Sequence, residues 1–127
     1  MITGLSDLPH LEELYISHNL LSEISGLESS TNLRILDVSN NQIQHLTGLK
    51  ELSKLEELWA SSNQLDSFEE VEQELKDKME LETVYLEMNP LQLRSPALYR
   101  NKVRLALPKI KKIDACRCLD QCFSSQG

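Results

Sequence analysis

Aliphatic residues return at a fixed spacing along this chain, and that spacing restricts the possible fold more than any other feature of the sequence. A frame of three aliphatic positions, one asparagine and a further aliphatic position begins at Leu11, Leu33, Leu55 and Leu81. The first three copies start 22 residues apart, and the fourth starts 26 residues after the third. Because a unit this short cannot bury an apolar face alone, the repetition predicts stacked units that share one continuous core.

The frame matches L-x-x-L-x-L-x-x-N-x-L, the pattern of leucine-rich repeats. Each copy is expected to form one short strand of a parallel sheet, a turn and a return segment on the outer face. The sequence therefore predicts an α/β fold, a leucine-rich-repeat solenoid of 22-residue repeats with a parallel concave sheet. The asparagine of each copy is expected to turn inward and bond the backbone of the turning loop, at Asn19, Asn41, Asn63 and Asn89.

The insertion before the fourth copy predicts a helix. Ser67 is followed three residues later by Glu70, a capping box that opens a helix expected over 68–79. Helical spacing then indicates which of its side chains face the core, namely Phe68, Val71, Leu75 and Met79.

The C-terminal part of the chain is predicted to close the solenoid. Ser95-Pro96 predicts the N-cap and the first turn of a helix that ends near Leu107. We therefore expect leucine-rich repeats over 1–93, a C-terminal helical cap over 94–115 and a disordered tail over 116–127.

The first repeat is incomplete. Residues 2–5 match the second half of the later copies, and no strand segment precedes them. Because the end of a solenoid needs a polar cover, Ile2, Leu5 and Leu8 would face water or a missing neighbour. We expect the chain to be the C-terminal part of a longer protein.

Charge divides the chain into an acidic body and a basic C-terminal segment. Residues 1–93 hold 5 Lys or Arg against 18 Asp or Glu, and residues 94–127 hold 8 against 2, which gives the net charge of −7. The acidic body argues against nucleic acid as a partner and favours a basic protein surface. No apolar run approaches the roughly 18 residues of a membrane helix, and the first residues lack a signal-peptide pattern. We expect an intracellular protein without a membrane partner.

Motifs for catalysis and for metal binding are absent from the sequence. It contains no nucleophile elbow, no glycine-rich phosphate loop and no H-E-x-x-H motif, so neither an enzyme nor a cofactor or small-molecule substrate is expected. His10, His18 and His45 fall at different repeat positions, so no metal cluster is expected. The cysteines are expected to be free thiols, at Cys116, Cys118 and Cys122.

Alternation along each strand indicates which side chains face outward on the concave sheet. One row is expected to contain Tyr15, Asp37, Trp59 and Tyr85. Acidic residues are expected beside it, at Glu13, Glu57 and Glu87. Aromatic residues also occur in strands for their β-propensity alone. Tyrosine and tryptophan are nevertheless common at binding hot spots, and carboxylates attract lysine and arginine of a partner, so these seven residues are the predicted partner-binding site.

The last repeat and the segment after it carry a more specific pattern. Residues 81–91, Leu-Glu-Thr-Val-Tyr-Leu-Glu-Met-Asn-Pro-Leu, and the ending Tyr99-Arg…Leu105-Ala-Leu-Pro…Ile113-Asp-Ala resemble the leucine-rich-repeat regulatory subunits of protein phosphatase-1, the regulatory subunit 7 family. The resemblance covers nearly all of residues 1–115. It implies a non-catalytic protein that grips the phosphatase catalytic subunit on its concave face.

The same resemblance implies a location in the nucleus, and also in the cytoplasm, and a role in mitosis and the cell cycle, often together with the inhibitor-3 protein. The family's contact positions match Asp37, Glu57, Trp59 and Tyr85 in residue type and repeat position, and Tyr15 lies in the same row. The chain lacks the family's many N-terminal repeats, and residues 116–127 match no tail of the family. A scaffold of another assembly, such as a splicing particle or a cytoskeletal complex, is the alternative, because such proteins share short repeats and similar ends.

Overall fold

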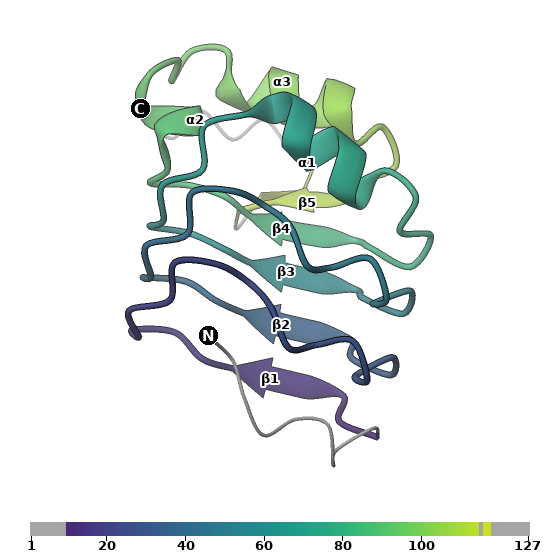
Figure 1. Cartoon of the computed structure of the whole chain (residues 1–127). Coiled ribbons are helices and arrows are strands. Elements are labelled where there is room, and N and C mark those ends of the chain that lie inside the picture. The colour runs from purple at the N-terminus through teal and green to yellow at the C-terminus, as the bar shows by residue number, and fades with distance from the viewer. Residues whose placement is uncertain (1–9, 115, 118–127) are drawn as a thin grey trace.

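The computed structural model describes residues 10–114 and 116–117 and shows a solenoid whose strands stack in chain order (Figure 1). Among these residues, five strands run parallel in one sheet, and a sixth, β6 (Cys116–Arg117), pairs antiparallel with the fifth. The parallel strands are β1 (Glu13–Tyr15), β2 (Ile35–Asp37), β3 (Glu57–Trp59), β4 (Thr83–Tyr85) and β5 (Lys112–Ile113). The predicted leucine-rich-repeat solenoid is confirmed.

Strand pairing follows the repeat without a register shift. Leu14 pairs with Leu36, Leu36 with Leu58, and Leu58 with Val84, so the same repeat position lines up across the sheet. Leu36, Leu58 and Val84 are fully buried, and Leu14, in the first described strand, is partly buried. The aliphatic frame read from the sequence therefore forms the core, and the alternate positions of each strand face away from it.

Asn41, Asn63 and Asn89 turn inward and form a ladder of hydrogen bonds between successive turns, as predicted, whereas the prediction that Asn19 turns inward is wrong. The Asn63 amide nitrogen donates to the backbone oxygens of Val38, Ala60 and Ser61 at 3.0 to 3.2 Å, and its Oδ1 accepts from the Ile43 backbone nitrogen at 3.1 Å. Asn41 and Asn89 make equivalent bonds and are also buried. Asn19 bonds backbone oxygens of its own turn but is exposed.

Helix α1 (Phe68–Leu75) begins as the capping box predicts, because Ser67 Oγ accepts a hydrogen bond from the Glu70 backbone nitrogen at 3.2 Å. Val71 and Leu75 are buried, and Phe68 packs against the core. The helix ends at Leu75, so the predicted end at residue 79 is wrong. Met79 lies in the segment beyond it, 72% exposed, and the prediction that Met79 faces the core is also wrong.

The physical reason for the early end lies in the contacts just after the helix. The Lys78 backbone nitrogen donates to the Leu75 oxygen at 3.0 Å, and Lys78 Nζ donates to the Leu49 oxygen of the preceding repeat. These bonds turn the chain towards β4 before another helical turn forms.

After β4, the chain forms the short helix α2 (Pro90–Leu93), which the sequence reading did not include, and then α3 (Tyr99–Ala106). The predicted helix start at Ser95-Pro96 is wrong, because residues 95–98 form turns that precede the helix N-cap at Leu98. One face of α3 is buried, and it contains Tyr99, Val103 and Ala106. Helices α1 and α3 pack together at the C-terminal end of the solenoid (Figure 1).

The division into repeats, cap and tail stays a prediction. Residues 1–9, 115 and 118–127, with Ile2, Leu5, Leu8, Cys118 and Cys122, lie outside the described residues. Of the predicted tail, Cys116 and Arg117 form β6. Within the described part of the chain, no helix is long and apolar enough to span a membrane.

Candidate protein-binding face

The sheet brings the predicted aromatic residues together in one row. Tyr15 pairs with Asp37, Asp37 with Trp59, and Trp59 with Tyr85. The Trp59 ring lies between the two tyrosines, with ring-centroid distances of 6.3 Å to Tyr15 and 5.1 Å to Tyr85. The interplanar angles are 78° and 49°, an edge-to-face and a tilted contact of the kind that aromatic pairs favour. The rings therefore form a continuous apolar strip across β1 to β4.

Asp37 lies in this row but below its surface. Tyr15 and Trp59 stand two strands apart and their rings meet across the strand that carries Asp37, which is only 9% exposed. Its Oδ1 accepts a hydrogen bond from the Ser39 backbone nitrogen at 3.0 Å. Asp37 is therefore part of the row in sequence position, but its buried side chain offers little surface to a partner.

Carboxylates of the neighbouring row fix the aromatic side chains. Tyr15 donates its hydroxyl proton to Glu13 Oε1 at 2.9 Å, and the Trp59 indole nitrogen donates to Glu57 Oε1 at 2.9 Å. The hydrogen bond to Glu13 raises the pKa of Tyr15. Burial, with the charge of Glu57 beside it, raises the pKa of Tyr85. Tyr15 and Trp59 thus turn their polar groups to a carboxylate and keep their apolar ring surface available.

Glu87 continues the acidic surface just beyond β4. It is half-buried, and burial together with the charge of Asp114 raises the pKa of its carboxyl group. Tyr85, Glu57 and Glu87 therefore share one region of negative potential, in which a cation would be stabilised.

A second set of acidic residues, one position before each strand, is paired within the chain. Arg34 Nε lies 2.8 Å from Glu56 and its Nη1 lies 3.3 Å from Glu12, and the Arg34 hydrogen bond lowers the pKa of Glu56. Glu82 pairs with Lys111 at 3.4 Å. Among the described residues, the other ion pairs involve Glu70 and Asp66, and none involves Glu13, Glu57 or Glu87.

The ion pairs of Arg34 were not predicted from the sequence. The signal for these pairs was available, because Glu12, Arg34 and Glu56 occupy the same repeat position in successive copies and parallel strands place equal positions side by side. The pairing separates acidic residues that are neutralised inside the chain from those that are open to a partner.

A metal centre finds no support in the part of the chain that the structure describes. No group of three or more His, Cys, Asp or Glu side chains there is arranged to hold a metal ion. The face instead combines aromatic surface with unpaired carboxylates, which suits contact with another protein.

Comparison with known families agrees with the architecture. A family model for leucine-rich repeats (two copies) matches residues 9–52 and 31–76, which together make up more than half of the chain. The chain belongs to the leucine-rich-repeat family.

Particular relatives carry the resemblance further. Protein phosphatase 1 regulatory subunit SDS22 of Schizosaccharomyces pombe is 61% identical over 51 residues, which are 40% of this chain and 15% of that protein. Protein phosphatase 1 regulatory subunit 7 is 55% identical over 51 residues in Homo sapiens, covering 40% of this chain and 13% of that protein. In Bos taurus it is 62% identical over 42 residues, covering 33% of this chain and 11% of that protein.

These matches confirm the similarity to phosphatase regulatory subunits, over a shorter part of the chain than the predicted residues 1–115. The matched segments span at most 15% of the length of these three relatives. These relatives are named regulatory subunits, which agrees with the expectation that the chain is not an enzyme.

Solved structures support the fold. A chain in the Drosophila melanogaster SNF/U2A' complex superimposes with a TM-score of 0.82 at 23% identity, covering 99% of this chain and 76% of that chain. An internalin, InlF, from Listeria monocytogenes superimposes with a TM-score of 0.67 at 31% identity, covering 87% of this chain and 30% of that chain. The first likeness, at this identity, concerns the fold alone.

Proposed function

We propose that this chain belongs to a regulatory subunit of protein phosphatase-1 and binds the phosphatase catalytic subunit through its concave face. The observation that carries the proposal is the strip of Tyr15, Trp59 and Tyr85 beside the carboxylates of Glu13 and Glu57, which form no ion pair with any residue that the structure describes. The similarity to phosphatase regulatory subunits supports the choice of partner.

The physical basis of binding is an ordered aromatic surface beside negative charge. The hydrogen bonds to Glu13 and Glu57 hold the Tyr15 and Trp59 rings in place before a partner arrives, which reduces the entropy lost on binding. The rings then bury apolar area against the partner. The carboxylates steer the approach of lysine and arginine side chains and select a basic surface.

The test is a titration of the chain with the purified phosphatase-1 catalytic subunit, read by calorimetry. Trp59→Ala is expected to cost about 2–4 kcal/mol of binding free energy, because the indole lies at the centre of the strip. The matched control is Phe68→Ala, which removes an aromatic ring from α1 on the other side of the sheet and should leave the affinity unchanged. Equal affinity of the Trp59→Ala variant and the unaltered chain would refute the site.

Inhibitor-3 as a further partner, a nuclear and cytoplasmic location, and a role in mitosis rest on the family resemblance. A second titration, of inhibitor-3 into the preformed complex, tests the first of these. A pull-down that recovers splicing-particle or cytoskeletal proteins, and no phosphatase, would favour the alternative scaffold instead.

A further inference from the structure

The face of the sheet that carries the aromatic strip continues beyond β4, and the next strand adds a cation to it. Figure 1 shows β5 beside β4 at the C-terminal end of the sheet, and Lys112 of β5 pairs with Thr83, which pairs in turn with Glu57. Ile113, the next residue of β5, is fully buried in the core, so strand alternation turns Lys112 to the opposite face, where Glu57 lies. One row across β3, β4 and β5 therefore contains a carboxylate, a hydroxyl and an ammonium group, in that order.

Lys112 is half-buried and makes no ion pair with any residue that the structure describes. The lysine before it is neutralised instead, since Lys111 Nζ lies 3.4 Å from a carboxylate oxygen of Glu82. Asp114, which follows β5, accepts hydrogen bonds from two backbone nitrogens just after β4 and from the hydroxyl of Tyr99. The ammonium group of Lys112 is thus available to a partner.

Glu57 and Lys112 carry opposite charges in the same row but form no ion pair with each other. Two strand spacings of about 4.8 Å separate their backbones, roughly 10 Å in total. Thr83 lies between them and is only 7% exposed, and Glu57 Oε1 accepts the hydrogen bond of the Trp59 indole nitrogen. Because neither charge has a counter-charge in the described part of the chain, a partner that supplies one at each position is favoured.

We infer, on the basis of the proposed function, that Lys112 binds a carboxylate of the phosphatase catalytic subunit. The partner surface presents a cation to Glu57 and an acidic residue to Lys112, two strand spacings apart along the row. The order of these charges determines how the partner lies across the sheet, because the reversed orientation places like charges together at both positions. Lys112 therefore selects the orientation of a partner that the aromatic strip binds.

Carbodiimide cross-linking of the chain with the purified catalytic subunit tests both charges at once. The reagent joins a lysine amine to a carboxylate in direct contact with it, and mass spectrometry of the digested complex identifies each pair. We expect a cross-link from Glu57 to a partner lysine and one from Lys112 to a partner Asp or Glu, at partner positions roughly 10 Å apart. A cross-link at Glu57 without one at Lys112 would overturn the inference and leave the proposed function standing, whereas a mixture with neither would contradict both.

Asp120, which lies outside the described residues, is the competing partner for Lys112 within the chain. The same reagent is therefore applied to the chain alone. A cross-link from Lys112 to Asp120 there would assign the ammonium group to the chain's own C-terminal segment and overturn the inference. A cross-link from Lys112 that appears only with the catalytic subunit supports the intermolecular contact.

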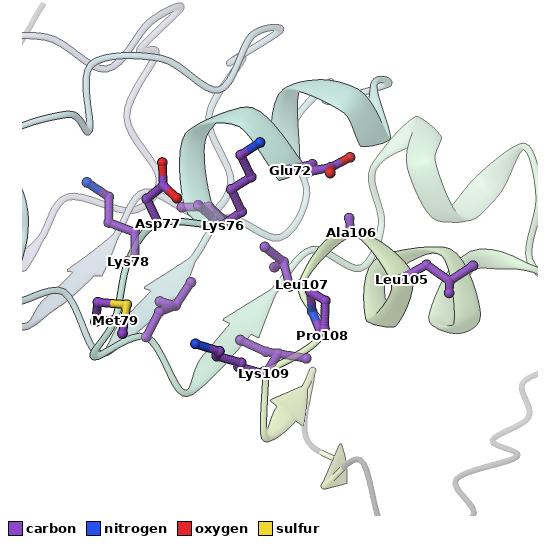
Figure 2. A pocket seen from close by; sticks show the side chains of 13 residues that line it. Glu72, Lys76, Asp77, Lys78, Met79, Leu105, Ala106, Leu107, Pro108 and Lys109 are labelled. Atoms are coloured by element: carbon purple, nitrogen blue, oxygen red, sulfur yellow. The ribbon is translucent and has the colours of Figure 1, made fainter.

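Matched lysine variants measure how much the contact contributes to affinity. Lys112→Glu should weaken binding about tenfold at low salt and less at high salt, because it replaces an attraction with a repulsion. Lys112→Arg keeps the charge and should leave the affinity unchanged. Lys109→Glu is the control for net charge, because Lys109 is exposed in a groove between the end of α1 and the end of α3, away from the sheet (Figure 2).

Thermal melting checks that each variant is folded. If Lys112→Glu binds as tightly as the unaltered chain while Trp59→Ala weakens binding, the inference fails and the proposed function remains. If neither variant changes the affinity, the proposed function fails as well.

Exchange of the two charges separates their order from the net charge. The double variant Glu57→Lys with Lys112→Glu has the same net charge as the unaltered chain. It should nevertheless lose affinity by about the product of the two single effects, because the two positions are far enough apart to act independently. A double variant that binds like the unaltered chain would show that the order of the charges does not matter, and would overturn the inference.

Discussion

The indole nitrogen of Trp59 donates a hydrogen bond to the carboxylate of Glu57 at 2.9 Å, across a single intervening residue of β3. Residues two apart on a strand point to the same face, so this bond lies on the sheet surface and not in the core. It holds the ring between Tyr15 and Tyr85 while the charge of Glu57 stays next to it. One pair of residues thus supplies both the apolar and the charged part of the proposed contact.

Charge reversal at Glu57 should act on the rate of association. Glu57→Lys replaces an attractive group with a repulsive one, so association with the phosphatase catalytic subunit should slow and depend less steeply on salt. Stopped-flow mixing at several salt concentrations measures this effect. Glu51→Lys, the same reversal at an exposed residue outside the sheet, is the control for net charge. An association rate that Glu57→Lys leaves unaltered would argue against a steering role.

Removal of a buried ladder asparagine should destabilise the fold. Asn63→Ala leaves the Ile43 backbone nitrogen and several backbone oxygens without their partner, which should lower the free energy of unfolding by about 2–4 kcal/mol. Asn19→Ala, at the equivalent exposed position, should cost less than about 1 kcal/mol. Urea unfolding measures both variants, and equal losses would show that burial does not govern the ladder.

The strand positions were predictable from the sequence, because the repeat determines how the strands pair and which side of the sheet each side chain faces. A spacing of 22 residues places Tyr15, Asp37 and Trp59 at one repeat position, and parallel pairing then makes them neighbours. The early end of α1 was not predictable in this way, because it depends on the bond from Lys78 to Leu49, which lies in the preceding repeat. Helical periodicity depends only on residues close in sequence, so it wrongly placed Met79 on the core-facing side of the helix.

The sequence predicts which residues face the concave side of the sheet, but not how deeply each side chain is buried. Alternation indicates that Asp37 faces the concave side, but its burial depends on the size of the rings carried by β1 and β3. The pairing of Arg34 with Glu12 and Glu56 was predictable from their shared repeat position, although strand alternation does not show it because these residues lie just before their strands.

A side chain at Gly48 should not be tolerated. Gly48 has a φ of +78°, and a Cβ atom there would lie 2.1 Å from the backbone oxygen of Ile24 in the preceding repeat. Gly48→Ala should therefore lower the free energy of unfolding by at least about 2 kcal/mol, from backbone strain and the clash together. The exposed neighbour Thr47→Ala is the control in the same loop. Thermal unfolding compares them, and similar midpoints would show that the turn relaxes freely.

The carboxyl group of Asp114 joins β5 to β4. It accepts hydrogen bonds from the backbone nitrogens of Leu86 and Glu87 at 3.0 and 3.1 Å and from the Tyr99 hydroxyl at 3.0 Å. Burial nevertheless raises the pKa of Asp114, and burial together with the charge of Asp114 raises the pKa of Glu87. The folded state therefore binds protons at this pair more tightly than the unfolded state does.

This raised pKa should make the contribution of Asp114 to stability fall as the pH rises. The contribution is greatest below the unfolded pKa of about 4 and is lost as the pH rises through the raised pKa of the folded state. Asp114→Asn cannot ionise, keeps an oxygen that accepts the Leu86 and Glu87 bonds, and tolerates the φ of +59° at this position. Unfolding midpoints of both proteins between pH 4 and about pH 7 should show the original chain losing stability relative to the variant. Carboxyl groups remote from this pair titrate equally in both proteins and cancel in the difference, so a difference that is constant or increases with pH would contradict the assignment.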